Sequence, residues 1–386
     1  MKTLVKNGKV WVDRELQELD ILLDGKCIVK IGKDIAADGA EVIDAAGKYV
    51  MPGVIDCHVH LSMDGSPTPM AHLSKQREAE AILVGVRSCK ELVENGVTTI
   101  RECGGIGLES VILQKEVNAG NIVGPRIITC GKAIKIPGGH FFGAEVTGAQ
   151  EAKYAARTLI KEGAQYIKLM ATGGLGKQGE KPGVCELDVE EMKAAIDEGK
   201  KHGMGAAAHC HSKEGMMNAV EAGVTTLEHC TFIDEEIVDK IYENNVIVVP
   251  TFAPYVQMAS IGRENGVSAY MCEMSTNITE AKYRTFHLFL EKGIKIAFGR
   301  DAGAPLVRHG DYVLEMLAME KAGMSKKDII VSATENAAEA VQVSNITGSI
   351  TEGKSADIII LNGDPTADLS NYKSIYAVYA QGVRVR

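Results

Sequence analysis

The sequence has few prolines, a single tryptophan, no CxxC motif and no long apolar run. Among its 386 residues there are 10 Pro, 1 Trp and 9 Cys. An odd number of scattered cysteines argues against a disulfide framework and favours reduced thiols, so we expect a cytoplasmic location. No apolar stretch approaches the ~18 residues of a membrane span, and the first residues lack the apolar segment of a secretory signal. The sequence therefore predicts no membrane partner.

Positive charge is also scarce. The chain has 42 Lys+Arg against 51 Asp+Glu, a formal net charge of −9, and so lacks the basic balance that general nucleic-acid binding requires. Nucleic acid is therefore excluded as a partner. A hydrophobic content of 45% excludes disorder and is enough for a large core without disulfides. What the chain does have is ten histidines, several of which follow short apolar runs.

The middle of the chain alternates short apolar segments with helical patterns. Strands are expected at 54–57, 97–101, 126–130, 166–170, 205–208, 224–227, 246–249 and 294–298. Helices are expected at 78–95, 151–162, 189–202, 213–222, 235–244 and 311–322. Eight strands alternating with helices predict an α/β fold, the (β/α)8 or TIM barrel. Long connections at 132–149 and 251–280 are expected to carry specificity or to act as lids.

The two ends of the chain have a different sequence pattern. Short apolar pieces near the start are broken by turn signals such as Asn7-Gly8 and Asp24-Gly25. The last forty residues show the same pattern, with Gly348 and Gly382 as breaks. We therefore expect a small composite β-sandwich domain made of residues 1–51 plus 346–386. The barrel, at 52–345, is then inserted between its two pieces.

Metal-ligating residue types gather where the expected strands end. His58 and His60 are two residues apart and share one face of a strand. That spacing suits a divalent transition metal, and it also suits two hydrogen-bonded core histidines. Lys168 lies in an apolar strand, where it needs a carboxylate, solvent contact or carbamylation by CO₂. Three later strands end in His209, His229 and Asp301. The joint set favours a metal site at the barrel mouth.

These motifs resemble the amidohydrolase superfamily over essentially the whole chain. The segment Pro52-Gly-Val-Ile-Asp-Cys-His-Val-His60 is the most specific of them. Three further segments are similar to the imidazolonepropionase-like and Xaa-Pro-dipeptidase-like branch: 99–105, 138–140 and 167–174. Members of this branch hydrolyse amide bonds, including those of dipeptides and N-acyl amino acids. The one departure is Arg300, where the family usually has a small residue.

The resemblance implies a binuclear metal centre. The residues that it assigns to the first metal are His58, His60 and Asp301, those for the second are His209 and His229, and the bridge is Lys168 as N6-carboxylysine. Zinc is the favoured metal, with manganese, cobalt and iron left open. Two cations lower the pKa of a water between them toward ~7, so that hydroxide attacks the carbonyl. Asp301 then accepts the proton of the water and passes it to the departing amine.

Three residues are candidates for substrate contact. His140 follows two glycines, which allow close approach of the backbone, and we expect it to stabilise the oxyanion or to bind substrate. His211 faces inward with His209 by pleat alternation, and either contacts substrate or supports the site. Arg101 is a candidate for binding a substrate carboxylate. Other basic candidates for that role are Lys177, Arg263 and Arg308.

We therefore expect a metal-dependent hydrolase of carbon–nitrogen bonds. Its substrate is a dipeptide, cleaved before the C-terminal residue, or an N-acyl amino acid. One alternative is a cyclic amide hydrolase of the imidazolonepropionase type or a mononuclear deaminase, and such sites dispense with Lys168. Another is a non-catalytic scaffold, against which the complete set of six ligand positions argues. The only partners expected are the small-molecule substrate and further copies of the chain in a homo-oligomer.

Overall fold

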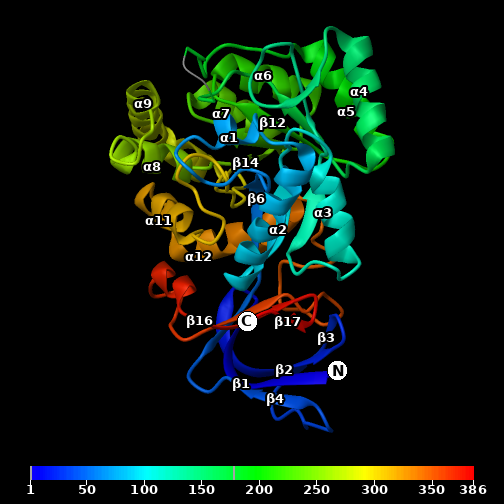
Figure 1. The fold of residues 1–386 in the computed structure, drawn as a ribbon. Helices are drawn as coiled ribbons and strands as arrows, with labels where there is room; N and C mark the ends of the chain where they lie inside the picture. Colours follow the sequence, from blue (N-terminus) through cyan, green and yellow to red (C-terminus); the bar gives the residue numbers. More distant parts are fainter. Residues whose placement is uncertain (1, 177–178) are drawn as a thin grey trace.

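The computed structural model describes residues 2–176 and 179–386. A barrel surrounded by helices lies above a sheet to which both chain ends contribute, and both termini lie at that sheet (Figure 1). β6 enters the barrel directly after the last strand that the amino-terminal segment gives to the sheet. This connection places the start of β6 next to the sheet and its end at the far side of the barrel.

Parallel strands form the barrel wall. One sheet has the order β6-β7-β8 and the other the order β10-β9-β11-β12-β13-β14. Their bounds are β6 (Val54–Val59), β7 (Val97–Glu102), β8 (Arg126–Thr129), β9 (Ala133–Lys135), β10 (Gly143–Glu145), β11 (Ile167–Met170), β12 (Ala206–Cys210), β13 (Thr226–His229) and β14 (Ile247–Val249). The α/β barrel class predicted from the sequence is confirmed. β9 and β10, which lie within the expected connection at 132–149, were not predicted.

Contacts outside the regular ladders join the two sheets. Gln165 N donates to the carbonyl of Thr129 at 2.7 Å, which links the end of β8 to the start of β11. On the other side, Val248 bridges Ile296 and Val59 bridges Ala302, both in parallel. The eighth strand expected at 294–298 is therefore a bridged segment and not a regular strand. Asp301, with a φ of 59°, interrupts its pleat.

Helices cover the outside of the barrel, and those expected from the sequence occur within three residues of their predicted ends. Their bounds are α1 (Pro69–Leu73), α2 (Glu78–Glu94), α3 (Glu109–Asn118), α4 (Ala149–Glu162), α5 (Val189–Lys200), α6 (Lys213–Ala222), α7 (Glu235–Glu243), α8 (Ala253–Ile261), α9 (Ala269–Thr285), α10 (His287–Lys292), α11 (Val313–Lys321), α12 (Lys326–Val331), η1 (Ser332–Asn336), α13 (Ala337–Ala340) and η2 (Leu369–Lys373). None of the helices in the described part of the chain is long and apolar enough to cross a bilayer.

The long connection expected at 251–280 is largely helical. Proline at the start of α8 sets the φ of a first turn, and Ser268 caps α9 by accepting from Met271 N. These two helices pack against each other and form a hairpin at one side of the barrel (Figure 1). The two helices of this connection were not predicted, although the start signals at Pro254 and Ser268 are present in the sequence.

Both ends of the chain share one eight-stranded sheet. Its order is β17-β16-β15-β5-β1-β2-β3, with β4 paired to β1. The bounds are β1 (Lys2–Val12), β2 (Glu15–Asp24), β3 (Cys27–Gly32), β4 (Glu41–Asp44), β5 (Tyr49–Pro52), β15 (Ile358–Leu361), β16 (Ile375–Ala380) and β17 (Val383–Arg384). Apolar side chains from both ends, such as Val10, Ile21 and Ile360, form one core. The exact division at 51/52 and 345/346 stays a prediction.

Candidate active site

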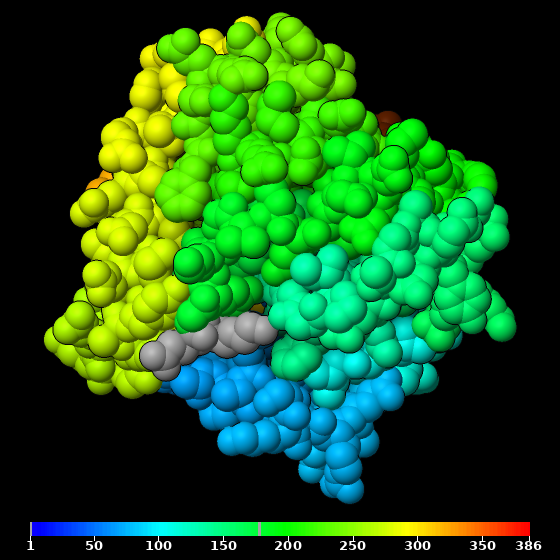
Figure 2. All heavy atoms as spheres, turned by 90° about the horizontal axis from the view of Figure 1, so that it is seen from above, coloured from blue at the N-terminus to red at the C-terminus, as the bar shows by residue number. Residues whose placement is uncertain are grey.

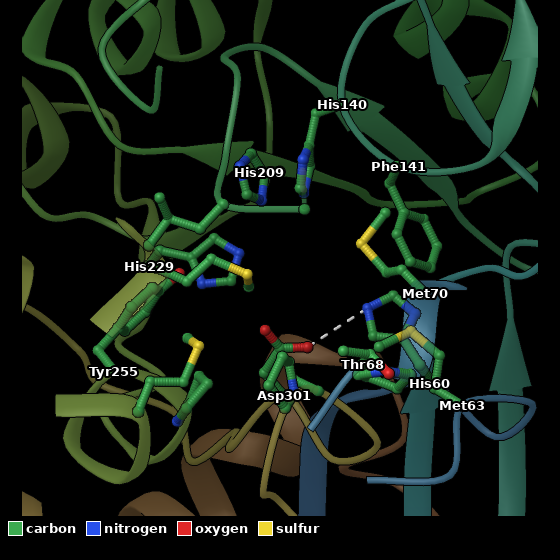
Figure 3. Close-up of a pocket in the computed structure, with 18 of the residues that line it drawn as sticks. His60, Met63, Thr68, Met70, His140, Phe141, His209, His229, Tyr255 and Asp301 are labelled. Carbon is green, nitrogen blue, oxygen red and sulfur yellow. Dashed lines mark ion pairs between the residues drawn. The ribbon is translucent and has the colours of Figure 1, made fainter. Parts of the chain in front are cut away.

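A cavity of about 360 Å³ opens at the carboxyl ends of the barrel strands. All six residues expected as metal ligands line it: His58, His60, Lys168, His209, His229 and Asp301. The labelled side chains converge from different strands on a common centre (Figure 3). In the view from above, the blue segment that carries α1 meets green and yellow segments around this end of the barrel (Figure 2). The sequence spacing and the fold therefore bring the same set together.

His58, His60 and Asp301 form one cluster. A possible ligand atom of each lies within 4.8 Å of the others. Asp301 Oδ1 is 3.7 Å from His58 Nε2 and 3.4 Å from His60 Nε2. The other ring nitrogens are engaged elsewhere, because His58 Nδ1 donates to Glu228 at 2.8 Å and His60 Nδ1 donates to the carbonyl of Gly104 at 2.9 Å. Both Nε2 atoms therefore face the carboxylate.

His209, His211 and His229 form a second cluster, again with ligand atoms within 4.8 Å of one another. His209 Nε2 donates to the carbonyl of Gly173 at 3.3 Å, and His229 Nδ1 lies 2.6 Å from Thr251 Oγ1. Each of these two rings keeps one nitrogen for the cavity.

His211 differs from its neighbours in this cluster. Its Nδ1 lies 2.8 Å from Thr231 Oγ1 and its Nε2 lies 3.2 Å from the Tyr255 hydroxyl. The ring is stacked on His229 with the centroids 4.9 Å apart. His211 faces inward as expected, but both of its nitrogens have partners, so its position favours a supporting contact through Tyr255.

Burial keeps three of the expected ligand imidazoles neutral. Loss of solvation lowers the pKa of His60 to about 4 and holds the pKa values of His209 and His229 well below the usual range. Burial also disfavours the charged form of His58, but the charges of Cys103 and Asp301 outweigh it and raise the pKa of His58 to about 10. A neutral imidazole offers the lone pair that a divalent metal requires, so His60, His209 and His229 have the protonation state of metal ligands, and His58 must release a proton to become one.

Lys168 is buried beside both clusters. Its side chain is 1% exposed, and its amine has no hydrogen-bond partner among the described residues. Its charge acts on the histidines of both clusters. A buried amine without a hydrogen-bond partner is costly, and the charge of Glu228 acts on it only without a hydrogen bond. The orphaned amine, the neutral imidazoles and the carboxylate together fit a pair of divalent cations.

Left-handed backbone occurs where the ligand-bearing strands end. The φ angles are 70° at His229, 48° at Thr251 and 59° at Asp301. Such conformations are uncommon outside glycine and cost about 1–3 kcal/mol each. The bridged segment before Asp301 contains Gly299, where a Cβ would lie 2.4 Å from Val249 Cγ1. Strain and close packing are thus concentrated around the cavity.

Glu228, which lies directly before His229, was not predicted as a site residue. It is fully buried and accepts hydrogen bonds from His58 and from Arg101, the latter at 2.6 Å. Burial raises its pKa, but the charge of Arg101 and the hydrogen bond from His58 outweigh this and hold the pKa at about 2. A charged residue in an apolar strand next to a histidine was the available signal.

Arg101 is not placed as the sequence predicts. Its guanidinium donates to Glu228, to the carbonyl of Cys57 at 2.8 Å and to Thr226 Oγ1 at 2.8 Å. It does not line the cavity, because the interior carboxylate of Glu228 holds it between the strands. The expectation of a substrate contact at Arg101 therefore has no support in the structure.

The remaining basic candidates are also away from the cavity. Arg300 is fully buried and pairs with Asp56 at 2.7 Å, so its side chain does not disturb Asp301. Arg263 and Arg308 are not among the described residues that line the cavity. Lys177 lies outside the described residues. No described arginine lines the cavity.

His140 reaches the cavity from the connection after β9. Its ring lies over His209 with the centroids 4.2 Å apart, and its Nδ1 donates to Glu180 at 2.6 Å. Burial raises the pKa of Glu180, but the hydrogen bond and charge of His140 hold it at about 2. Gly174 leaves room for this ring, since a Cβ there would be 2.4 Å from His140 Cε1. His140 therefore lines the cavity beside His209, and its role in oxyanion stabilisation or substrate binding stays a prediction.

The rest of the cavity wall is apolar. Methionines approach from several sides, and Met70 and Phe141 lie near His60 in Figure 3. Apart from Lys168 and Asp301, no charged side chain lines the cavity in residues 2–176 and 179–386. The apolar lining residues include Met63, Met70, Phe141, Leu175, Met258 and Met271. Such a wall accepts bulky uncharged groups.

Comparisons relate the chain to known proteins along its whole length. The pattern of the Amidohydrolase family matches residues 49–385. Ochratoxinase from Aspergillus niger is 28% identical over 360 residues, which cover 85% of this chain and 73% of that protein. A solved Xaa-Pro dipeptidase with bound methionine in its active site is 30% identical, with a TM-score of 0.89, and the match covers 100% of this chain and 99% of that one. A prolidase in complex with N-methylphosphonate-L-proline is 26% identical, with a TM-score of 0.92 and 100% of both chains covered.

Proposed function

Since the chain belongs to the Amidohydrolase family and is a hydrolase of amide bonds, we propose that it is a binuclear metal-dependent enzyme acting on a dipeptide or an N-acyl amino acid. The observation that carries the proposal is Lys168, a buried amine without a partner beside neutral histidines and a carboxylate. Similarity to a Xaa-Pro dipeptidase and to ochratoxinase supports the substrate class.

We assign the ligands in two groups. His58, His60 and Asp301 would hold one metal ion, His209 and His229 would hold the other, and Lys168, once carboxylated, would supply a ligand shared by the two. The geometry of the two clusters supports this assignment, and zinc suits imidazole and carboxylate donors. When bound, the ions lower the pKa of a water molecule and polarise the scissile carbonyl.

Asp301 handles the proton in this proposal. Its Oδ1 lies 3.4 Å from His60 Nε2, and its side chain points into the cavity (Figure 3). From this position the carboxylate accepts the proton of the attacking water and delivers it to the departing amine. Its left-handed backbone, with φ at 59°, turns the side chain away from the barrel wall. We therefore assign Asp301 as the catalytic residue for proton transfer.

His140 and Tyr255 approach the substrate position from two sides of the cavity (Figure 3). In this proposal the imidazole of His140 stabilises the oxyanion of the tetrahedral intermediate, because preorganised donors act strongly in a water-poor site. The Tyr255 hydroxyl is held by His211 at 3.2 Å. We therefore propose His211 as a residue that orients Tyr255.

The cavity walls favour an apolar substrate. A volume of about 360 Å³ accommodates a substrate of dipeptide size. Met70 and Met271 adapt to irregular apolar groups because their side chains are unbranched and polarizable. We propose that the group packed against them is bulky and uncharged.

The test combines metal analysis with a substrate library. The purified chain is assayed for bound metal and incubated with dipeptides and N-acyl amino acids that differ in apolar bulk. We expect two metal ions per chain and release of free amino acid, fastest for apolar substrates. Release of ammonia from a base, or opening of a cyclic amide without any hydrolysis in the library, would contradict the proposal.

A further inference from the structure

Helix α9 places a buried lysine at the ends of two barrel strands. Lys282 is 3% exposed. Its ammonium group donates to the backbone carbonyls of His229 and Pro250, the latter at 2.5 Å. His229 ends β13 and Pro250 follows β14, and these strands are neighbours in the sheet. Lys282 therefore joins the two strands at the point where their ladder stops.

The carbonyls that Lys282 holds belong to strained backbone. The φ angles are 70° at His229, 48° at Cys230 and 48° at Thr251. The His229 carbonyl lies between the first two of these residues, and the Pro250 carbonyl directly precedes the third. Left-handed conformations of such residues persist only where surrounding contacts impose them. Lys282 supplies one such contact on each strand end.

Thr251 connects this backbone to the imidazole of His229. Its Oγ1 lies 2.6 Å from His229 Nδ1, which leaves Nε2 for the cavity. The next two residues are held from the opposite side, because the carboxyl group of Glu315 accepts from Phe252 N at 2.8 Å and from Ala253 N at 2.6 Å. The orientation of the His229 ring therefore depends on a segment fixed by α9 and α11.

We propose that Lys282 is a positioning residue for the half of the metal site formed by His209 and His229. Without its ammonium group, two buried carbonyls lose their donor and Thr251 moves relative to the His229 ring. The metal on that half then dissociates, while the metal on His58, His60 and Asp301 is retained. The inference rests on the proposed binuclear function.

Zinc binding by the whole chain tests this inference. Wild type, Lys282→Met and Thr251→Val are loaded with Zn²⁺, dialysed and titrated with a competing chelator. We expect the wild type to hold two ions tightly. Each variant should hold one of them tightly and bind the other about 10-fold or more weakly, as is typical when a group that orients a metal ligand is lost. A matched control is Lys354→Met. Lys354 donates to Ser349 Oγ at 2.8 Å and does not line the cavity. That variant should hold both ions.

Background variants identify which ion is lost. With His60→Ala, the remaining zinc lies on His209 and His229, so adding Lys282→Met should weaken its binding about 10-fold or more. With His209→Ala, adding Lys282→Met should change nothing further. Retention of both ions at wild-type affinity by Lys282→Met or by Thr251→Val overturns the inference. If Lys282→Met does not fold, the zinc affinity of Thr251→Val tests the inference instead. A wild type that binds no zinc refutes the binuclear function itself, which is a different result.

Discussion

On one side of the cavity His58 is oriented by a carboxylate inside the barrel, whereas on the other side His229 is oriented by a hydroxyl group that follows a strand end. Glu228 accepts from His58 and from Arg101, and all three side chains are buried. Thr251, in contrast, is positioned by backbone contacts to Lys282 and Glu315. We call His58, Glu228 and Arg101 the barrel-supported half. We call His229, Thr251 and the residues that position Thr251 the hairpin-supported half.

The difference shows how tolerance to change is distributed in the site. A buried ion pair is costly to break because the remaining charge has no partner. The hydrogen bonds that Lys282 and Glu315 make to backbone groups are individually weaker than such an ion pair, but α8 and α9 also supply Tyr255, Met258 and Met271 to the cavity wall. The hairpin-supported half is therefore the one in which metal retention and substrate contact share the same elements.

The largest effect is expected where the two halves meet. Lys168→Ala removes the proposed bridge, so the chain should lose one metal ion. The kcat/KM should fall about 10³-fold, because metal ions supply several kcal/mol of transition-state stabilisation. Metal analysis and amide hydrolysis measure this. Lys135→Ala is the control, because Lys135 is another buried lysine but donates to the Phe141 carbonyl at 3.0 Å. Full occupancy and turnover in Lys168→Ala would show that the halves need no bridge.

Replacing one buried glutamate in each half tests the comparison directly. Glu228→Gln leaves the charge of Arg101 unpaired, so the free energy of unfolding should fall by about 3–5 kcal/mol. The kcat/KM should fall about 10- to 100-fold as His58 loses its orienting carboxylate.

Glu315→Gln should have a much smaller effect. Burial raises the pKa of Glu315 to about 8, so near neutral pH Glu315→Gln leaves no unpaired charge and loses only one of the two acceptors for Phe252 N and Ala253 N. Urea unfolding and steady-state kinetics compare the two variants. Equal losses in both would remove the distinction between the halves.

Charge introduced into the cavity wall should change substrate binding without changing metal content. Met70→Glu lies on the side of His60 and Met271→Glu lies on α9. Each should lower kcat/KM for apolar substrates about 10-fold through KM, because a carboxylate in an apolar pocket loses contact and solvation. Met70→Leu and Met271→Leu should remain close to wild type. Loss of zinc in Met271→Glu but not in Met70→Glu would show that the part of the cavity wall supplied by α9 also affects zinc binding.

The stability of the metal-free chain should also depend on pH. The folded-state pKa of His60 is lowered to about 4, and burial also lowers those of His209 and His229. Below about pH 6.5 the unfolded chain therefore binds more protons, and stability falls as pH decreases, by at most about 1.4 kcal/mol per pH unit for each histidine.

The Glu228 pair follows a lower pH window. Its folded pKa of about 2 lies below the unfolded value near 4.3, so its contribution is complete above that value and is lost as pH falls toward about 2. Urea unfolding between pH 7 and about pH 4.5 should therefore report the histidines and not the Arg101–Glu228 pair. Glu102 and Glu315 oppose the histidines over this range, because burial raises their pKa values to about 8 and their contribution to stability grows as pH falls. A pH profile that stays unchanged in His60→Ala and in His209→Ala would contradict the assignment of neutral buried imidazoles.

The strand-end residues were predictable because the spacing of neighbouring residues is enough to indicate them. His58 and His60 share a face of one strand, and Lys168 stands out in an apolar run. The helix start signals at Pro254 and Ser268 could also have been used for α8 and α9. Arg101 was misassigned because a basic residue near a strand end has the same local pattern whether it faces the cavity or the interior.

The sequence by itself determined the α/β barrel class, the strand ends that carry the proposed ligands and the family resemblance, since periodicity and residue spacing act over a few residues. Only the tertiary structure decided that Arg101 pairs with Glu228, that Arg300 pairs with Asp56, and that Lys282 reaches His229. These partners are separated by tens to hundreds of positions along the chain. Their pairing depends on how strands and helices pack, because a buried charge takes whichever partner the fold places beside it.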